Sequence, residues 1–146
     1  RDARDVPAGQ TRDYIFGYTI LNDVSARDVQ TAHKQWYFGK SLDGFTPIGP
    51  CIVTADAFAD YPPRLGIRSF VNGEKRQDSN TALQIFDIDH VIAELSQGMT
   101  LKAGTIIATG TPAGVGMGMD PPQFLKPGDT VRCEIDGIGS LTNTVR

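Results

Sequence analysis

Cysteine is scarce in this sequence, and long hydrophobic runs are missing. Only two cysteines, Cys51 and Cys133, occur in 146 residues, and they form neither a CxxC pair nor a cluster with histidine. This arrangement favours two reduced thiols over a disulfide or a zinc site. No segment approaches the roughly 18 consecutive apolar residues of a membrane-spanning helix, and residues 1–12 contain no signal-peptide core. We therefore expect a soluble, cytoplasmic protein without a membrane partner.

The chain also lacks a block of charge of one sign. Its 14 basic and 17 acidic residues give a net charge of −3 and are spread along the sequence. Nucleic-acid-binding domains usually carry a basic patch, and disordered tails carry runs of like charge. The composition therefore argues against a nucleic-acid partner and names no other macromolecular one. A hydrophobic content of 40% is enough to form a core, so we expect one globular unit.

Glycine and proline, by contrast, are slightly more frequent than usual, with 16 and 9 copies. They separate short β-like runs, which predicts a mainly β (β-rich α+β) fold with many turns. Asn72-Gly73, between two of these runs, is the signature of a type I′ hairpin. An apolar stretch ends at residues 22–23, and the further β-like runs cover residues 48–53, 65–71, 74–77, 105–109, 130–135 and 140–145.

One or two short helices complete the expected fold. Apolar residues recur at helical spacing between residues 88 and 95, with Asp87 or Asp89 available as the N-cap and Gly98 as the stop. Residues 11–16 form a second, shorter candidate. We expect the helix that begins near residue 88 to lie against the sheet.

A dense polar cluster, residues 22–30, directly follows the first apolar stretch and contains Asp23, Ser25, Arg27 and Gln30. A strand that ends here would present these side chains to a cleft. The alternative is an ordinary helix start, in which Asp23 or Ser25 caps the helix and Arg27 is solvated. From the pattern alone both interpretations stay open, and the capping one is the commoner in proteins.

Two further segments could carry chemistry. Lys40 stands alone in the aromatic, glycine-rich segment 36–50, where it is either a desolvated electrostatic group or a surface lysine that covers apolar neighbours. The glycines of segment 108–116 follow a β-like run, so backbone N–H groups there could approach an anion. Neither a P-loop nor a GxGxxG motif is present, so a plain loop is the alternative.

Taken together, these segments resemble the fumarylacetoacetate hydrolase superfamily, particularly the branch with 2-hydroxyhepta-2,4-diene-1,7-dioate isomerases, acylpyruvate hydrolases and oxaloacetate decarboxylases. The resemblance implies a twisted mixed β-sheet roll and a homodimer. It runs over nearly the whole chain and rests on Asp13 to Tyr18, Asn22 to Gln30, Gly39-Lys40-Ser41, Val71 to Glu74, Ser96 to Leu101, Thr109 to Pro112, Gly114 to Gly116, and Gly137 to Gly139.

The resemblance also implies roles for individual residues. Asp23 matches a carboxylate ligand of a divalent cation, usually Mg²⁺, with Mn²⁺ or Ca²⁺ in relatives, and such ions prefer oxygen ligands. Arg27 and Gln30 match substrate-binding positions. Lys40 matches the catalytic lysine that faces the oxo or enolate oxygen of the substrate, and Thr111 matches a threonine that holds its carboxylate or oxo group.

The sequence departs from the family in one respect. Members supply two more metal ligands from a Glu-x-Glu and, in hydrolytic members, a His/Glu pair on a lid, both upstream of the matched segment. The chain opens at Arg1 without either motif, so we expect residues 1–146 to be a partial catalytic domain. His33 and His90 do not match the catalytic histidine, and we expect them to be surface or hydrogen-bonded residues.

These observations favour a metal-dependent enzyme acting on small 2-oxo acids, as a C–C bond hydrolase, isomerase or decarboxylase of aromatic or 2-oxo acid catabolism. The contrasting hypothesis is a catalytically silent β module that only dimerises or binds a small anion. One carboxylate alone binds Mg²⁺ poorly, which favours the silent module if nothing completes the site.

Overall fold

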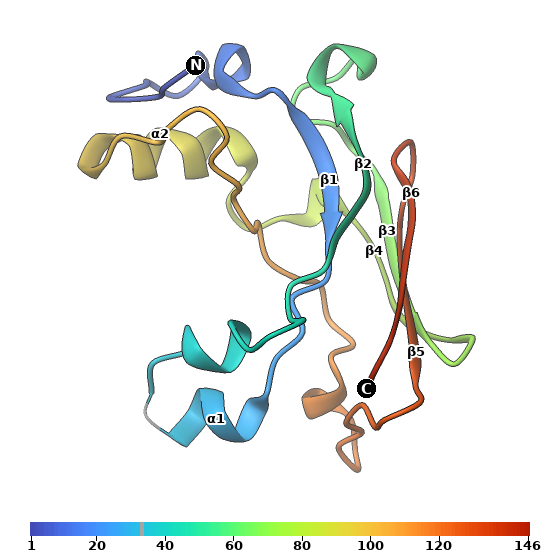
Figure 1. The fold of residues 1–146 in the computed structure, drawn as a ribbon. Coiled ribbons are helices and arrows are strands. Elements are labelled where there is room, and N and C mark those ends of the chain that lie inside the picture. Colours follow the sequence, from blue (N-terminus) through green and yellow to red (C-terminus); the bar gives the residue numbers. More distant parts are fainter. Residues whose placement is uncertain (33) are drawn as a thin grey trace.

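The computed structural model describes residues 1–32 and 34–146, and it shows two antiparallel β-sheets and two α-helices (Figure 1). The two-stranded sheet pairs β1 (Gly17–Leu21) with β2 (Ile48–Thr54). The expected β-rich fold with one or two short helices is confirmed. The four-stranded sheet has the order β4 (Glu74–Asn80), β3 (Gly66–Val71), β5 (Thr130–Ile135), β6 (Gly139–Thr144).

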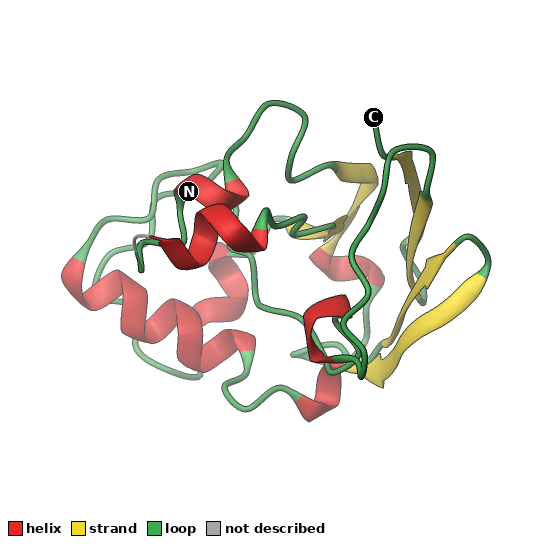
Figure 2. Ribbon diagram, turned by 90° about the horizontal axis from the view of Figure 1, so that it is seen from below, coloured by secondary structure: helices red, strands yellow, loops and turns green. Residues whose placement is uncertain are grey.

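The sheets lie against each other, as Figure 2 shows from below. Strand β2 contacts β6, and β1 contacts β5. Ile20 of β1 is 2% exposed and Val131 of β5 is 7% exposed, so apolar side chains of both sheets leave water. Cys51 in β2 and Cys133 in β5 are free thiols, as expected.

The β3–β4 hairpin confirms the turn predicted at Asn72-Gly73. Both residues have positive φ, 52° and 84°, which a type I′ turn requires and which Asn and Gly adopt at the lowest steric cost. The Asn72 side chain donates a hydrogen bond of 2.8 Å to Asp129 and accepts one of 2.9 Å from the backbone N–H of Thr130. The turn is thus tied to the start of β5.

One irregularity interrupts the pairing of β3 with β4. Ser69 pairs with Gln77, but the next residue, Phe70, pairs with Lys75, so Arg76 is an extra residue on β4. Such a β-bulge rotates the side chains of one strand relative to its partner. Because side chains alternate between faces in a regular strand, the bulge changes which residues of β4 share a face.

Helix α2 (Ile88–Gly98) begins where the sequence predicts, since the Asp87 side chain accepts a hydrogen bond of 2.8 Å from the backbone N–H of His90. The expectation that it lies against the sheet is wrong. Its Ile92 packs on the N-terminal segment in a buried cluster with Ala3, Val6 and Leu101, and Figure 1 shows the helix beside that segment. Helical spacing reveals which face of a helix is apolar but not what covers that face.

The strand predicted at residues 105–109 is also not formed. This segment has the composition of a strand, but no other part of residues 1–32 and 34–146 pairs with it, and Ile106 is 61% exposed. A strand forms only with a partner for its backbone hydrogen bonds, whatever its residues prefer.

The remaining helices are short. The first predicted helix is a 3-10 turn that ends at Tyr14, two residues before the predicted end at Phe16. No helix in the described residues is long and apolar enough to cross a membrane. Besides η1 (Thr11–Tyr14) and helix α1 (Arg27–Ala32), the short helical turns are η2 (Phe38–Lys40), η3 (Ala55–Ala57), η4 (Thr81–Leu83) and η5 (Gly116–Gly118).

Candidate active site

Asp23 and Lys40 form an ion pair beyond the end of β1. Strand β1 ends at Leu21, and Asp23 follows in the link to α1, whereas Lys40 closes η2. Lys40 Nζ donates a hydrogen bond to Asp23 Oδ2 and a second one of 3.0 Å to Ser25 Oγ. The side chains of Lys40 and Asp23 are 27% and 39% exposed, so a partly desolvated cation and carboxylate lie side by side. Both acceptors hold the ammonium group in place.

A close contact between η2 and the start of α1 brings these residues together. Gly39 is buried, and its carbonyl oxygen accepts a hydrogen bond of 2.8 Å from the backbone N–H of Ala26. A Cβ atom at Gly39 would lie 2.8 Å from both Cβ and N of Gln30 and 2.9 Å from the Ala26 carbonyl oxygen. Only glycine permits this approach. Packing therefore explains why position 39 is glycine, while the neighbouring Lys40 supplies the charge of the site.

Arg27 and Gln30 form a second pair on one face of α1. Arg27 Nη1 donates a hydrogen bond of 2.8 Å to Gln30 Oε1 at the helical i, i+3 spacing. Gln30 is only 5% exposed, and Arg27 is half-buried. The guanidinium is thereby oriented by a buried amide, and its remaining N–H groups are available to an anion.

Thr111 lies in the loop after residues 105–109 and is anchored to the four-stranded sheet. Gln77 Nε2 of β4 donates hydrogen bonds of 2.8 Å to Thr111 Oγ1 and of 2.8 Å to the carbonyl oxygen of Pro112. The buried Ser69 of β3 donates one of 2.8 Å to Gln77 Oε1. Of the residues predicted for the site, the structure thus pairs Asp23 with Lys40 and Arg27 with Gln30. In the described part of the chain, Thr111 is hydrogen-bonded to Gln77, which was not predicted, and to none of the other four.

The alternative interpretation of residues 22–30 as an ordinary helix start is correct in one part, because helix α1 begins at Arg27, but the predicted capping by Asp23 or Ser25 is wrong. In the described chain Asp23 and Ser25 accept hydrogen bonds from Lys40, and neither side chain accepts one from a backbone N–H of α1. His90 is exposed and stacks on Phe86 at 4.8 Å between ring centroids, so the expectation of a surface histidine is confirmed for it. His33 lies outside the described residues.

Sequence reasoning missed Gln77 altogether. It stands in the wholly polar run EKRQDSN of β4, where no alternation marks one face as different from the other. A polar residue that is half-buried in a strand is informative only once its partners are known. The sequence suggested Ser25 as a helix cap, whereas in the structure its hydroxyl oxygen accepts a hydrogen bond from the Lys40 ammonium group.

A divalent cation would find one suitable ligand here. The Lys40 bond uses Asp23 Oδ2, and Oδ1 receives no hydrogen bond within the described part of the chain. A Mg²⁺ or Ca²⁺ site needs several oxygen ligands. Across residues 1–32 and 34–146, no three or more His, Cys, Asp or Glu side chains are grouped to hold a metal. The described residues alone therefore do not make a complete cation site.

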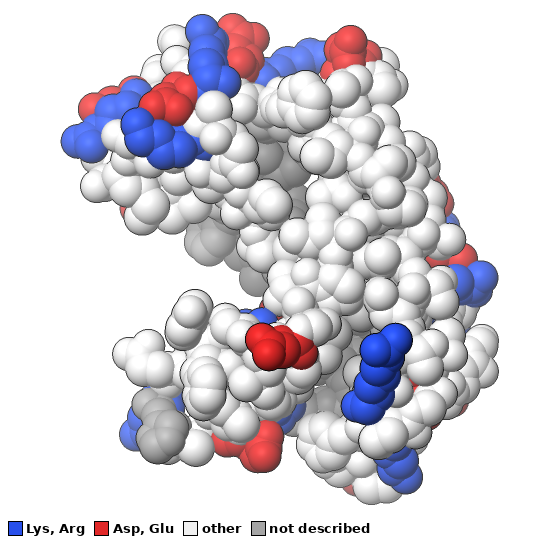
Figure 3. Space-filling model, in the orientation of Figure 1, with Lys and Arg blue, Asp and Glu red and all other residues white. Residues whose placement is uncertain are grey.

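The molecular surface is hollowed between the part formed by the N-terminal segment with α2 and the part formed by α1 (Figure 3). In that view the visible wall of the hollow is largely uncharged, and most charged side chains lie toward the periphery. An uncharged wall strengthens the field of the few charges near it.

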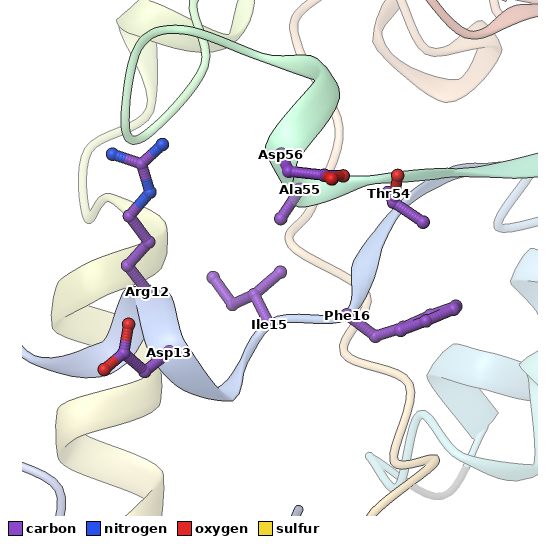
Figure 4. A pocket seen from close by; sticks show the side chains of 7 residues that line it. All are labelled: Arg12, Asp13, Ile15, Phe16, Thr54, Ala55 and Asp56. Atoms are coloured by element: carbon purple, nitrogen blue, oxygen red, sulfur yellow. The ribbon is translucent and has the colours of Figure 1, made fainter.

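A separate depression of about 400 Å³ lies at the opposite end of β1. Figure 4 shows Arg12 and Asp13 of η1 on one side, and Thr54 at the end of β2 with Ala55 and Asp56 of η3 on the other. Its lining contains none of the candidate site residues, which are Asp23, Arg27, Gln30, Lys40 and Thr111. We therefore place the candidate site at Asp23 and Lys40, where a cation, a carboxylate and a hydroxyl converge.

Comparison with known proteins identifies the family of the chain. The fumarylacetoacetate (FAA) hydrolase C-terminal family matches residues 1–146. The chain belongs to the fumarylacetoacetate hydrolase family. Oxaloacetate tautomerase YisK from Bacillus subtilis (strain 168) is 51% identical over 133 residues, which are 91% of this chain and 44% of that protein.

Solved structures of the fumarylacetoacetate hydrolase family match the fold closely. Fumarylacetoacetate hydrolase from psychrophilic Exiguobacterium antarcticum superimposes with a TM-score of 0.96 and 50% identity over 100% of this chain and 52% of that one. The 2-hydroxyhepta-2,4-diene-1,7-dioate isomerase from Mycobacterium marinum gives a TM-score of 0.87 and 46% identity over 99% of this chain and 53% of that one. The chain thus spans about half the length of the relatives it matches.

Proposed function

We propose that the full-length gene product is a fumarylacetoacetate hydrolase family enzyme that relocates protons on small 2-oxo acids, as an isomerase or tautomerase. The observation that carries this proposal is the Lys40 ammonium group held by Asp23 and Ser25. Relatives of the chain include an oxaloacetate tautomerase and a 2-hydroxyhepta-2,4-diene-1,7-dioate isomerase. Hydrolysis or decarboxylation would place the same demand on Lys40, but hydrolysis also needs an activated water.

The chemistry follows from the charge that develops on the substrate. When a base takes a proton from the carbon next to the 2-oxo group, the C–H electron pair becomes an enolate with negative charge on the oxygen, and the reaction ends when a proton is returned at a different substrate atom. A cation that is already fixed in a partly desolvated site stabilises the negative charge of the enolate, because the site does not have to reorganise when that charge forms. In this proposal Lys40 faces the enolate oxygen, while Arg27, Gln30 and Thr111 bind the substrate carboxylate or oxo group.

We also propose that Asp23 supplies one oxygen ligand to Mg²⁺, with Mn²⁺ or Ca²⁺ as substitutes. The free Oδ1 of Asp23 supports this role, and the site needs further oxygen ligands, because the described residues group no three His, Cys, Asp or Glu side chains that could hold a metal. When bound, such an ion polarises the 2-oxo group and neutralises the substrate carboxylate.

The first test is a keto–enol assay of the full-length gene product on a 2-oxo acid, in which the loss of enol absorbance is recorded over time. The second test is a calorimetric titration of the same protein with Mg²⁺ or Mn²⁺. The proposal requires acceleration above the buffer rate and metal binding that depends on Asp23. Absence of both in a folded, full-length protein would support the silent module that only dimerises or binds a small anion.

We propose in addition that the protein is a homodimer. Large apolar side chains remain exposed in this chain, including Phe16 at 74%, Leu83 at 73% and Ile85 at 92%. Exposed apolar surface of this kind favours association. Sedimentation of the full-length gene product is expected to give the mass of two chains, and a monomer at high protein concentration would contradict this.

A further inference from the structure

The loop that carries Thr111 is held by two consecutive residues of β4. Gln77 donates hydrogen bonds to Thr111 Oγ1 and Pro112 O, and Arg76 Nη1 donates to Gln123 Oε1 and lies 2.9 Å from Met119 Sδ. In a regular strand neighbouring side chains point to opposite faces. Arg76 is the extra residue of the bulge, so the bulge lets both side chains reach the same loop.

The loop also fits closely against the backbone of β4. A Cβ atom at Gly114 would lie 2.1 Å from the Arg76 carbonyl oxygen, and the φ of Gly114 is +106°. Both the space and the backbone angle therefore require glycine at this position. The side chain of Arg76 is only 16% exposed, so the loop covers it as well. Thr111 is consequently presented from a surface with little freedom to move.

The orientation of the Gln77 amide follows from its partners. A carbonyl oxygen can only accept a hydrogen bond, so the Gln77 atom that faces Pro112 O must be Nε2. The remaining oxygen, Oε1, then accepts from the Ser69 hydroxyl. Both protons of Nε2 are used, one on Pro112 O and the other on Thr111 Oγ1.

This arrangement determines what Thr111 can do. Its hydroxyl oxygen accepts from Gln77, so its own single proton is free for another acceptor. Hydrogen bonds arranged head to tail polarise one another, and the chain from Ser69 through Gln77 to Thr111 makes Thr111 a stronger donor. An anionic oxygen of the substrate is the acceptor that such a donor suits best.

We propose that Gln77 is a positioning residue that orients the Thr111 hydroxyl so that it donates its proton in a hydrogen bond to the substrate carboxylate or oxo oxygen. This inference rests on the proposed function, because it takes Thr111 as part of the substrate site. The proposal adds Gln77, which lies in β4 of the four-stranded sheet next to the β-bulge, to the site residues suggested by the sequence.

The experiment measures the Kd of the full-length gene product for oxalate, a planar mimic of a 2-oxo enolate, by calorimetry with Mg²⁺ present. Thr111→Val removes the donor and is expected to weaken binding by about 10–100-fold, the usual worth of a hydrogen bond to a charged group. Gln77→Met keeps the length of the side chain but frees Thr111, and a loss of about tenfold is expected. The double variant should bind no worse than Thr111→Val alone.

Arg76→Met is the matched control, because it loosens the same loop from the neighbouring residue and leaves the bond between Gln77 and Thr111 in place. Its Kd for oxalate is expected to stay within about twofold of the wild type, whereas loop amides exchange faster in both Arg76→Met and Gln77→Met. Equal losses of binding in the two variants would show that loop order alone matters and would overturn the proposal.

Two outcomes separate this inference from the proposed function. If Thr111→Val binds oxalate normally, Thr111 is not part of the site and the proposed function loses that residue. If Thr111→Val weakens binding but Gln77→Met does not, only the role of Gln77 fails. The hydrogen bond itself is checked by NMR: the Gln77 side-chain protons should exchange slowly and become faster in Thr111→Val. Fast exchange in the wild type would overturn the inference whatever the protein binds.

Discussion

The Lys40 ammonium group lies on the Asp23 carboxylate although 17 positions separate the two residues in the chain. The contact depends on η2 packing on the first turn of α1 through Gly39. In the proposed reaction, a charge held in this way needs no rearrangement when the enolate forms, and this is the condition under which electrostatic stabilisation is most effective. The same pair places a free carboxylate oxygen next to the cation.

Lys40→Met should remove the charge while keeping much of the side-chain length. We expect kcat of the full-length gene product on a saturating 2-oxo acid to fall by about 10²–10³, as for the loss of a comparable electrostatic group. Added Mn²⁺ should not restore the rate, because the metal does not replace the ammonium group. A near-normal kcat would return Lys40 to the status of a surface lysine that covers apolar neighbours.

Asp23→Ala should impair the protein by a different route. The variant loses a negatively charged oxygen ligand, so calorimetry is expected to show weaker binding of Mg²⁺ and Mn²⁺. High Mn²⁺ should therefore restore part of the activity, in contrast to Lys40→Met. Unchanged metal affinity in Asp23→Ala would exclude this carboxylate as a ligand and leave it only as the partner of Lys40.

Gly39→Ala should destabilise the site without touching any charged group. The new methyl group would meet Gln30 and Ala26 at 2.8 to 2.9 Å, and overpacking of this kind costs about 1–3 kcal/mol. Urea unfolding should show the loss. Gly98→Ala is the matched control, because nothing lies within 4 Å of a Cβ atom there and Ala is the better helix former. Equal stability of the two variants would contradict the tight contact at Gly39.

Tyr18 should make the folded chain less stable at high pH. Its ring packs edge-on against Phe58, with 5.5 Å between centroids, and burial raises its pKa from 10.0 to about 12. The unfolded chain therefore ionises first, so the contribution of Tyr18 is complete below its unfolded pKa of 10.0 and is lost as pH rises toward about 12. Urea unfolding across this range should show a steeper fall for the wild type than for Tyr18→Phe. Tyr61, whose pKa is also raised by burial, keeps its own share in both proteins.

The sequence by itself determined those turns and helix ends that depend only on interactions between neighbouring residues. Asn72-Gly73 adopts the two positive φ values of its turn, and Asp87 caps α2, because each depends on neighbouring residues only. The motif residues that resemble the fumarylacetoacetate hydrolase family pointed to Asp23 and Lys40 for the same reason: they stand in recognisable short segments.

Tertiary structure decided which of these residues meet. The partner of α2 is the N-terminal segment rather than a sheet, and residues 105–109 stay unpaired, since neither spacing nor β propensity specifies a partner. The link from Gln77 to Thr111 depends on one extra residue in β4, Arg76, which shifts the register against β3 and cannot be recognised in a wholly polar strand. Long-range pairing, register and the direction of a hydrogen bond arise only when the sheets have formed.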